Sequence, residues 1–454
     1  MSAAQSDYCQ IVLYKNGMFM RLSRQRLLQT AIKKYSKYLK YGSRFLPAAG
    51  AFFLTAILVK VLDPEQAGLF FVALASTQLV SMAALFGANV YFLREYAADH
   101  EQARATHRML FIKLWIFIVG AALSASAYAL TETHGQAYLY LIIGSAPFMA
   151  AMVLNSAVMR AQGSVLVAGL LGHGIVSFGI LVCMPMVFYL VGVSLDVLCG
   201  LHFILAIFFY LVSELVVYQG QHQAPVVKLS QVSEGTWWEG FCQSFFYKKT
   251  WRFGFMAVVV YLTQWLPIFL LQRHSLESVA VMSLAYRYAS ILSFLGVTID
   301  LAFAPMFAKM GTRGGGLELQ VIFRKIIRVL VPVATVFFVG MTAFVYVSDV
   351  FYLQGKYAGL LPVALIVFFS SSVLFALAPF TNLLLMSGLE RSCNNASIVC
   401  FAFVLLATVV GLDVIGSDYW VAIYMVAVYA VGKISASTYS VYVAKKHLLN
   451  AEIV

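Results

Sequence analysis

The chain has 454 residues, of which 62% are hydrophobic and only 11% are charged. Soluble domains contain about 25% charged residues, so this composition, with a mean hydropathy of +0.85, excludes an ordinary soluble enzyme and predicts a polytopic membrane protein. The net charge of +12 comes mainly from Lys and Arg residues in short segments between apolar runs. That distribution is typical of cytoplasmic loops rather than of a nucleic-acid-binding surface.

A basic leader, residues 1–44, precedes the first apolar run and contains nine Lys or Arg residues. Within it Leu28, Ile32, Tyr35 and Leu39 recur at helical spacing, with basic residues around them. Such an amphipathic helix can lie on an anionic membrane surface. No small-residue cleavage site follows a compact apolar core, so we predict a cytoplasmic leader rather than a signal peptide.

Twelve apolar segments follow the leader, and each is long enough for a helix to cross a bilayer. We place them at residues 45–62, 69–92, 109–130, 137–159, 165–190, 194–218, 253–272, 278–308, 326–348, 360–387, 396–412 and 419–443.

The loops between these segments predict the topology. If both termini are cytoplasmic, Lys and Arg residues collect in the inner loops, and the outer loops carry only Arg273 and Lys356. This asymmetry is the positive-inside pattern, and a wrong number of spans would destroy it.

The longest predicted inner loop, residues 219–252, divides the chain into two halves of six spans each. A weak internal repeat supports this division, because Glu65 and Glu277 each stand in a short outer loop before an Ala- and Leu-rich span. Repeated halves with a binding site between them are common in transporters. The predicted parts are a leader 1–44, an N-terminal lobe 45–218, a linker 219–252, a C-terminal lobe 253–443 and a cytoplasmic tail 444–454.

Ionisable residues inside the spans are the main functional candidates, because a charge at membrane depth normally faces a protein interior or a watery cavity. Arg287 lies near the middle of its span, and Lys433 lies near the middle of the last one. Among the charged residues deep within the spans, Asp300 is the acidic one. This excess of cations favours an anionic ligand, whereas structural pairing or snorkelling is the alternative for each residue.

Other ionisable residues lie nearer the predicted membrane boundaries. Lys60 is at the outer end of the first span, where snorkelling to the interface is expected. Lys113 and Glu214 are placed near the inner boundary and are interpreted as interfacial. His173 and His202 are interpreted as hydrogen-bonded packing residues, with proton relay as the alternative.

Prolines within the spans remove a backbone hydrogen bond and bend the helix. The bends are interpreted as packing kinks, with hinges for alternating access as the alternative. The residues concerned are Pro147, Pro185, Pro267, Pro332 and Pro379.

The sequence contains no nucleotide or catalytic motif. The glycine-rich run at residues 311–316 lacks the order of a P-loop, and no HExxH, GxSxG or CxxC motif is present. We therefore expect neither an enzyme nor a bound metal, cofactor or nucleotide, and no nucleic-acid partner.

Three stretches resemble the polysaccharide flippases of the multidrug/oligosaccharidyl-lipid/polysaccharide exporter (MOP) superfamily, the group that includes O-antigen and capsule-unit translocases. Residues 56–97 are similar to that family's first hairpin, with Arg94 at the basic end of the second span. Residues 283–310 are similar to its eighth span, and residues 351–391, with Asn382, are similar to its tenth span and the loop before it.

The resemblance implies an all-α fold of about 12 transmembrane helices, in two six-helix lobes around a central cavity, like that of MATE exporters. It implies a bacterial cytoplasmic-membrane flippase that moves undecaprenyl-diphosphate-linked oligosaccharide by alternating access. Its partners would be membrane lipids and the polysaccharide polymerase and chain-length machinery. The candidate substrate-binding cations are Arg287, Lys433, Lys60 and Arg94, and the candidate polar or coupling residues are Asp300 and Asn382.

Two alternatives remain open from the sequence. A cation-coupled multidrug exporter of the same fold would place acidic residues in the cavity. A membrane glycan polymerase or ligase would need a catalytic site on the outer side, where the predicted loops are short.

Overall fold

The computed structural model describes residues 46–89, 102–130, 139–162, 164–172, 174–192, 194–222, 248–311, 316–386, 389–415 and 418–446. All regular secondary structure in these ranges is helical. The leader, Arg94 and most of the predicted linker lie outside the described residues.

The N-terminal lobe begins with a first helix, Leu46–Val61, which leads directly into α2. The following helices are α2 (Pro64–Leu85), α4 (Gln102–Leu130), α5 (Leu139–Gly144), α6 (Ala146–Ala161), α7 (Val165–Leu170), α8 (Ile175–Val191) and α9 (Leu195–His222). Within this lobe α2, α4, α5, α6 and α9 pack against one another, and α8 packs on α9.

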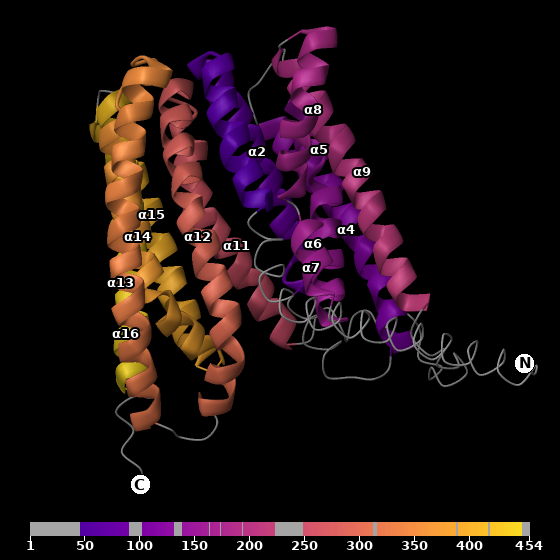
Figure 1. The fold of residues 1–454 in the computed structure, drawn as a ribbon, viewed down its shortest axis with the longest axis vertical. Helices are drawn as coiled ribbons and strands as arrows, with labels where there is room; N and C mark the ends of the chain where they lie inside the picture. Colours follow the sequence, from indigo (N-terminus) through magenta and orange to yellow (C-terminus); the bar gives the residue numbers. More distant parts are fainter. Residues whose placement is uncertain are drawn as a thin grey trace, which may run out of the picture.

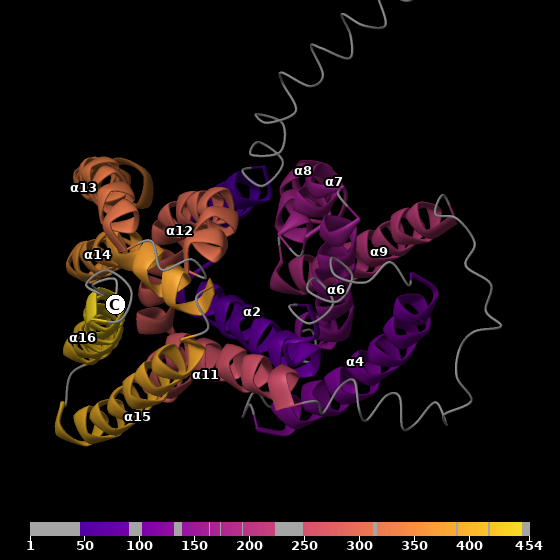
Figure 2. The same cartoon turned by 90° about the horizontal axis from the view of Figure 1, so that it is seen from below.

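The C-terminal lobe contains six further helical spans. These are α11 (Lys248–Leu271), α12 (Leu276–Gly311), α13 (Gly316–Val347) with the π-helix η2 (Ser348–Leu353), α14 (Leu360–Met386), α15 (Glu390–Val414) and α16 (Asp418–Ala444). Here α14 packs against both α12 and α16, and α15 lies between α11 and α16. The two lobes stand side by side in Figures 1 and 2.

Nine helices of the described residues are long and apolar enough to cross a membrane, and two shorter apolar helices are Leu46–Val61 and Ile175–Val191. Helix α12 is 36 residues long. Every one of the twelve predicted spans coincides with helix in the structure. The prediction of an all-helical, polytopic membrane protein is therefore confirmed.

Two predicted spans are each broken into two helices. The fourth span divides at Ser145, because Pro147 in the first turn of α6 cannot continue a helix from α5. The fifth span divides between α7 and α8 at a turn that contains Gly172 and Gly174. A side chain on Gly174 would meet Pro47 of the first helix, so the missing side chain also permits close packing there.

The predicted boundary after the ninth span is wrong by about one turn. The sequence interpretation ended this span at residue 348, whereas η2 continues the helix to Leu353. The turn that follows contains Gln354 at φ 55° and Gly355 at φ 73°, and this left-handed backbone ends the helix.

The lobes meet through α2, which contacts both α11 and α12 (Figure 2). Gly68 of α2 packs directly against the backbone of Leu276 at the start of α12. At the other end of α2, Phe86 lies against Gly254 of α11. Because α2 and α12 are the second and eighth spans, equivalent helices of the two halves touch each other.

The hydrophobic core is shared by the lobes at one end of the bundle only. We call this the outer end, following the predicted topology; the turns at 62–63, 272–275 and 354–359 lie there, at the top of Figure 1. The shared core includes Leu58, Phe71, Ile268, Ala285 and Phe368.

Towards the inner end the core divides into two. One inner core lies within the N-terminal lobe and includes Leu85, Ile116 and Val158. The other lies within the C-terminal lobe and includes Leu292 and Leu383. The lobes thus share one buried core in their outer halves and have separate buried cores in their inner halves, where α2 and α11 still touch at Phe86 and Gly254.

Candidate functional site

Arg287 lies at the level where the shared core ends. On α12, Ala285 and Tyr288 belong to the shared core, and Leu292, little more than one turn later, belongs to the inner C-terminal core. The Arg287 side chain lies deep in the protein and is half-buried. A cation is therefore placed where the two lobes begin to separate.

The environment of Arg287 is aromatic rather than acidic. Its guanidinium carbon lies 5.0 Å from the centroid of the Phe71 ring, which is a cation–π contact between α12 and α2. Among the described residues, the ion pairs are Lys113–Glu214 and Lys356–Asp63, and neither involves Arg287. The guanidinium donors are thus unsatisfied by any carboxylate that the structure describes.

His202 of α9 is a second basic residue near this site. Its side chain is 2% exposed, and neither ring nitrogen has a hydrogen-bond partner. It lies within electrostatic range of Arg287. The interpretation of His202 as a hydrogen-bonded packing residue is therefore wrong. The sequence signal available was one histidine in an apolar run, which cannot reveal a neighbour from the other lobe.

Lys433 does not share this position. It lies on α16 within the C-terminal lobe, with its ammonium nitrogen 5.9 Å from the Tyr429 ring centroid and with Cys400 of α15 nearby. The Tyr429 ring contacts the Tyr286 ring of α12 at 5.5 Å. Tyr286 precedes Arg287, so the two side chains leave α12 about 100° apart. Arg287 contacts α2, whereas the Lys433 environment is formed by the C-terminal lobe.

The other predicted site residues are separate from Arg287 or are not described. Lys60 is exposed at the outer end, and its ammonium group donates a 2.6 Å hydrogen bond to the carbonyl oxygen of Tyr352. Asp300 and Asn382 lie in α12 and α14, but their side chains are outside the described part of the structure, as is Arg94. Their proposed roles stay predictions.

A polar network that sequence interpretation missed lies inside the N-terminal lobe. Lys113 of α4 and Glu214 of α9 form an ion pair at 2.6 Å, and Asn155 of α6 donates to Glu214 at 3.1 Å. Asn155 also donates to the Ser213 hydroxyl at 2.8 Å. The side chains of Lys113 and Glu214 are 11% and 30% exposed, and each lies near one end of its span, Met109–Ala127 or Leu195–Gln219. The sequence interpretation missed their pairing, and their interfacial position stays a prediction. The one indication of this pair in the sequence was the presence of opposite charges in the third and sixth predicted spans.

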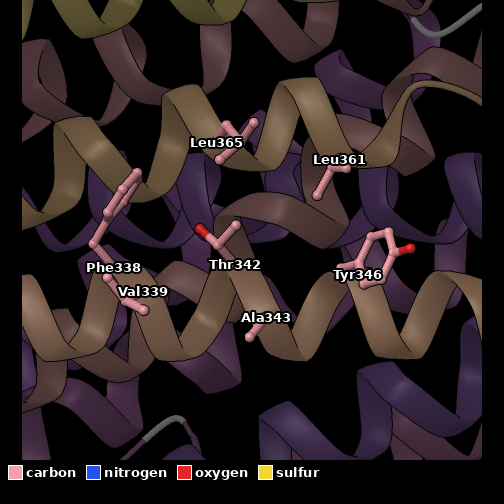
Figure 3. Close-up of a pocket in the computed structure, with 7 residues that line it drawn as sticks. All are labelled: Phe338, Val339, Thr342, Ala343, Tyr346, Leu361 and Leu365. Carbon is pink, nitrogen blue, oxygen red and sulfur yellow. The ribbon is translucent and has the colours of Figure 1, made fainter.

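An apolar groove of about 400 Å³ lies between α13 and α14 (Figure 3). These two helices stand at the edge of the C-terminal lobe (Figure 2). Hydroxyl groups of Thr342 and Tyr346 are the polar groups of its lining, so it has no cation for an anionic ligand. The lining residues are Phe338, Val339, Thr342, Ala343, Tyr346, Leu361 and Leu365.

Comparison with known proteins identifies the fold. No family model matches the chain, and no curated protein matches it in sequence. The chain is similar to a MOP superfamily transporter from Pyrococcus furiosus, described as having a binding pocket of reverse polarity that suggests a different function. The TM-score is 0.59 at 14% identity, over 90% of this chain and 96% of that one.

Two further solved structures have the same fold. One is a MATE transporter from Vibrio cholerae in a bent form, with TM-score 0.57 and 14% identity over 93% of this chain and 98% of that one. The other is an outward-facing multidrug resistance MATE transporter of the MOP superfamily, with TM-score 0.62 and 14% identity over 90% and 96%. The chain thus has the fold of MATE and MOP transporters.

Proposed function

We propose that this protein is a flippase of the bacterial cytoplasmic membrane, which exports undecaprenyl-diphosphate-linked oligosaccharide by alternating access. The observation that carries the proposal is Arg287, a deep cation at the junction of the two lobes without an acidic partner among the described side chains. A cation at such depth is favourable only when an opposite charge or a hydrated cavity compensates it. An anionic substrate would provide that charge.

The chemistry of Arg287 suits a diphosphate. A guanidinium group presents planar donors that bind phosphate oxygens in pairs, and such charge-assisted hydrogen bonds are stronger outside bulk water. The Phe71 ring lies 5.0 Å from the guanidinium carbon, and no described carboxylate pairs with the group. His202 would add a second donor from the N-terminal lobe.

The distribution of the core supports alternating access. The lobes share one buried core at the outer end and have separate buried cores towards the inner end, where α2 still touches α11. In the proposal a ligand is held by Arg287 at this boundary and enters from the inner side, where the buried cores of the two lobes are separate. Rocking of one lobe against the other around a central site would expose the same ligand to the other side.

A cation-coupled multidrug exporter is the rival function, since one similar structure is described as a multidrug resistance transporter. A site for cationic drugs requires carboxylates near the ligand. The described surroundings of Arg287 supply a cation and aromatic rings instead.

The deciding experiment is to measure the lipid-linked oligosaccharide pool, and its sidedness, in a strain lacking the gene. We expect complete repeat units to accumulate on the inner face of the membrane in this strain. Reintroduction of the intact gene should reverse the accumulation. Unpolymerised units on the outer face would instead indicate a polymerase or ligase. A normal pool with altered drug tolerance would overturn the proposal in favour of a drug exporter.

A further inference from the structure

Two lysines at the outer end bind the backbone of the opposite lobe. Lys60, in the last turn of the first helix, donates a 2.6 Å hydrogen bond to the carbonyl oxygen of Tyr352 in η2. Lys356, in the turn after η2, donates a 2.7 Å hydrogen bond to the carbonyl oxygen of Leu62. Each lobe therefore contributes one ammonium group to a helix end of the other.

The acceptors explain why lysine suits both positions. The last carbonyl groups of a helix have no partner within it, and the C-terminal end of a helix carries partial negative charge. Tyr352 stands at the end of η2, and Leu62 directly follows the first helix. An ammonium group donates a hydrogen bond to such a carbonyl oxygen. Its positive charge is also attracted by the partial negative charge at that end of the helix.

A third bond joins the same two segments. The hydroxyl of Tyr357 donates to the carbonyl oxygen of Val59 at 2.9 Å, and both residues are at most 1% exposed. Burial raises the pKa of Tyr357, so the hydroxyl remains a donor throughout the physiological pH range. The Lys356 ammonium group is also 3.8 Å from the exposed Asp63 carboxylate, a pair that adds little in water.

We propose that these contacts form an outer latch, defined as Lys60, Lys356 and Tyr357 with their backbone acceptors, that must open whenever the transporter faces outwards. The latch rests on the proposed alternating access. All of its bonds cross between residues 59–62 and 352–357, which belong to different lobes. Separation of the lobes at this end would break all three bonds together.

The test measures opening directly, without any substrate. Val59 is replaced by cysteine in a full-length variant whose six native cysteines are alanine, and cells are treated with a membrane-impermeant maleimide. Val59 is 0% exposed in the latched state, so its labelling rate reports how often the outer end opens. The latch variant is Lys60→Met with Lys356→Met, and the matched control is Arg273→Met, an exposed outer cation outside the latch.

We expect the double variant to be labelled roughly tenfold faster than its parent, since two charge-assisted hydrogen bonds are lost. The control should be labelled at the parental rate. Tyr357→Phe keeps the ring and removes one hydrogen bond, so we expect a smaller increase. If the double variant fails to insert into the membrane, Tyr357→Phe still tests the latch.

Equal labelling of the latch variants and the control would overturn the latch. Labelling only from the inner side, in inverted vesicles, would overturn its assignment to the outer end. Failure of the proposed function is a different result. In that case labelling changes as expected, but the oligosaccharide pool in the deletion strain is normal.

Discussion

The Arg287 guanidinium carbon of α12 lies 5.0 Å from the centroid of the Phe71 ring of α2, so a cation of one lobe rests on an aromatic ring of the other. A cation–π contact contributes about 0.5–2 kcal/mol, well below the several kcal/mol by which burial disfavours a lone charge. No carboxylate among the described residues pairs with the guanidinium. The proposed function assigns this pair as the platform for the anionic substrate at the junction of the lobes.

Replacing Arg287 with alanine or with lysine distinguishes the effect of its positive charge from the effect of its planar guanidinium geometry. We expect Arg287→Ala to reduce glycan export at least tenfold, because the anion loses its partner. Arg287→Lys should keep part of the activity, since the charge remains and the two-pronged donor geometry is lost. Export is measured in the complemented deletion strain at matched membrane levels. Normal export by Arg287→Ala would remove Arg287 from the site.

Lys433 provides a contrasting test, because it has no carboxylate partner among the described residues and lies within one lobe. We expect Lys433→Met to raise the thermal midpoint in detergent, since burial of a charge is relieved. Its effect on export should be smaller than that of Arg287→Ala. A loss of export as severe as in Arg287→Ala would support the prediction that Lys433 is a substrate-binding cation.

Gly68 determines how closely α2 approaches α12. A methyl group there would overlap the backbone carbonyl oxygen of Leu276, which cannot rotate away. We expect Gly68→Ala to destabilise the protein by roughly 1–3 kcal/mol, measured by thermal unfolding in detergent. The matched control is Gly340→Ala on α13, where an added methyl group would meet no side chain or neighbouring helix within 4 Å and helix propensity favours alanine. Equal midpoints for the two variants would contradict this account.

The Lys113–Glu214 ion pair should behave as a unit. We expect Lys113→Met and Glu214→Gln each to lower stability by roughly 1–3 kcal/mol, less than for a fully buried pair because Glu214 is 30% exposed. The double variant should recover much of this loss, because no unpaired charge remains. A double-mutant cycle of unfolding free energies measures the coupling. Strict additivity would show that the two residues do not depend on each other.

The sequence by itself determined the class of the protein and the approximate position of every span, although α2 covers Pro64–Leu85 rather than the predicted residues 69–92. Twenty-residue apolar runs can satisfy their backbone in a bilayer only as helices, and the scarcity of charge within them made Arg287 conspicuous. Span boundaries were less well determined at Ser145 and Leu353. There a proline and a left-handed turn, rather than hydropathy, set the helix ends.

Only the tertiary structure decided which of the deep charges meet. Helical periodicity states where a side chain lies on its own helix but not which helix faces it, so Arg287 and Lys433 could not be assigned to different environments. The same reason hid His202 near Arg287, the pairing of Lys113 with Glu214, and the lysines that join the lobes. Each of these contacts joins residues tens to hundreds of positions apart, which packing brings together and local pattern does not encode.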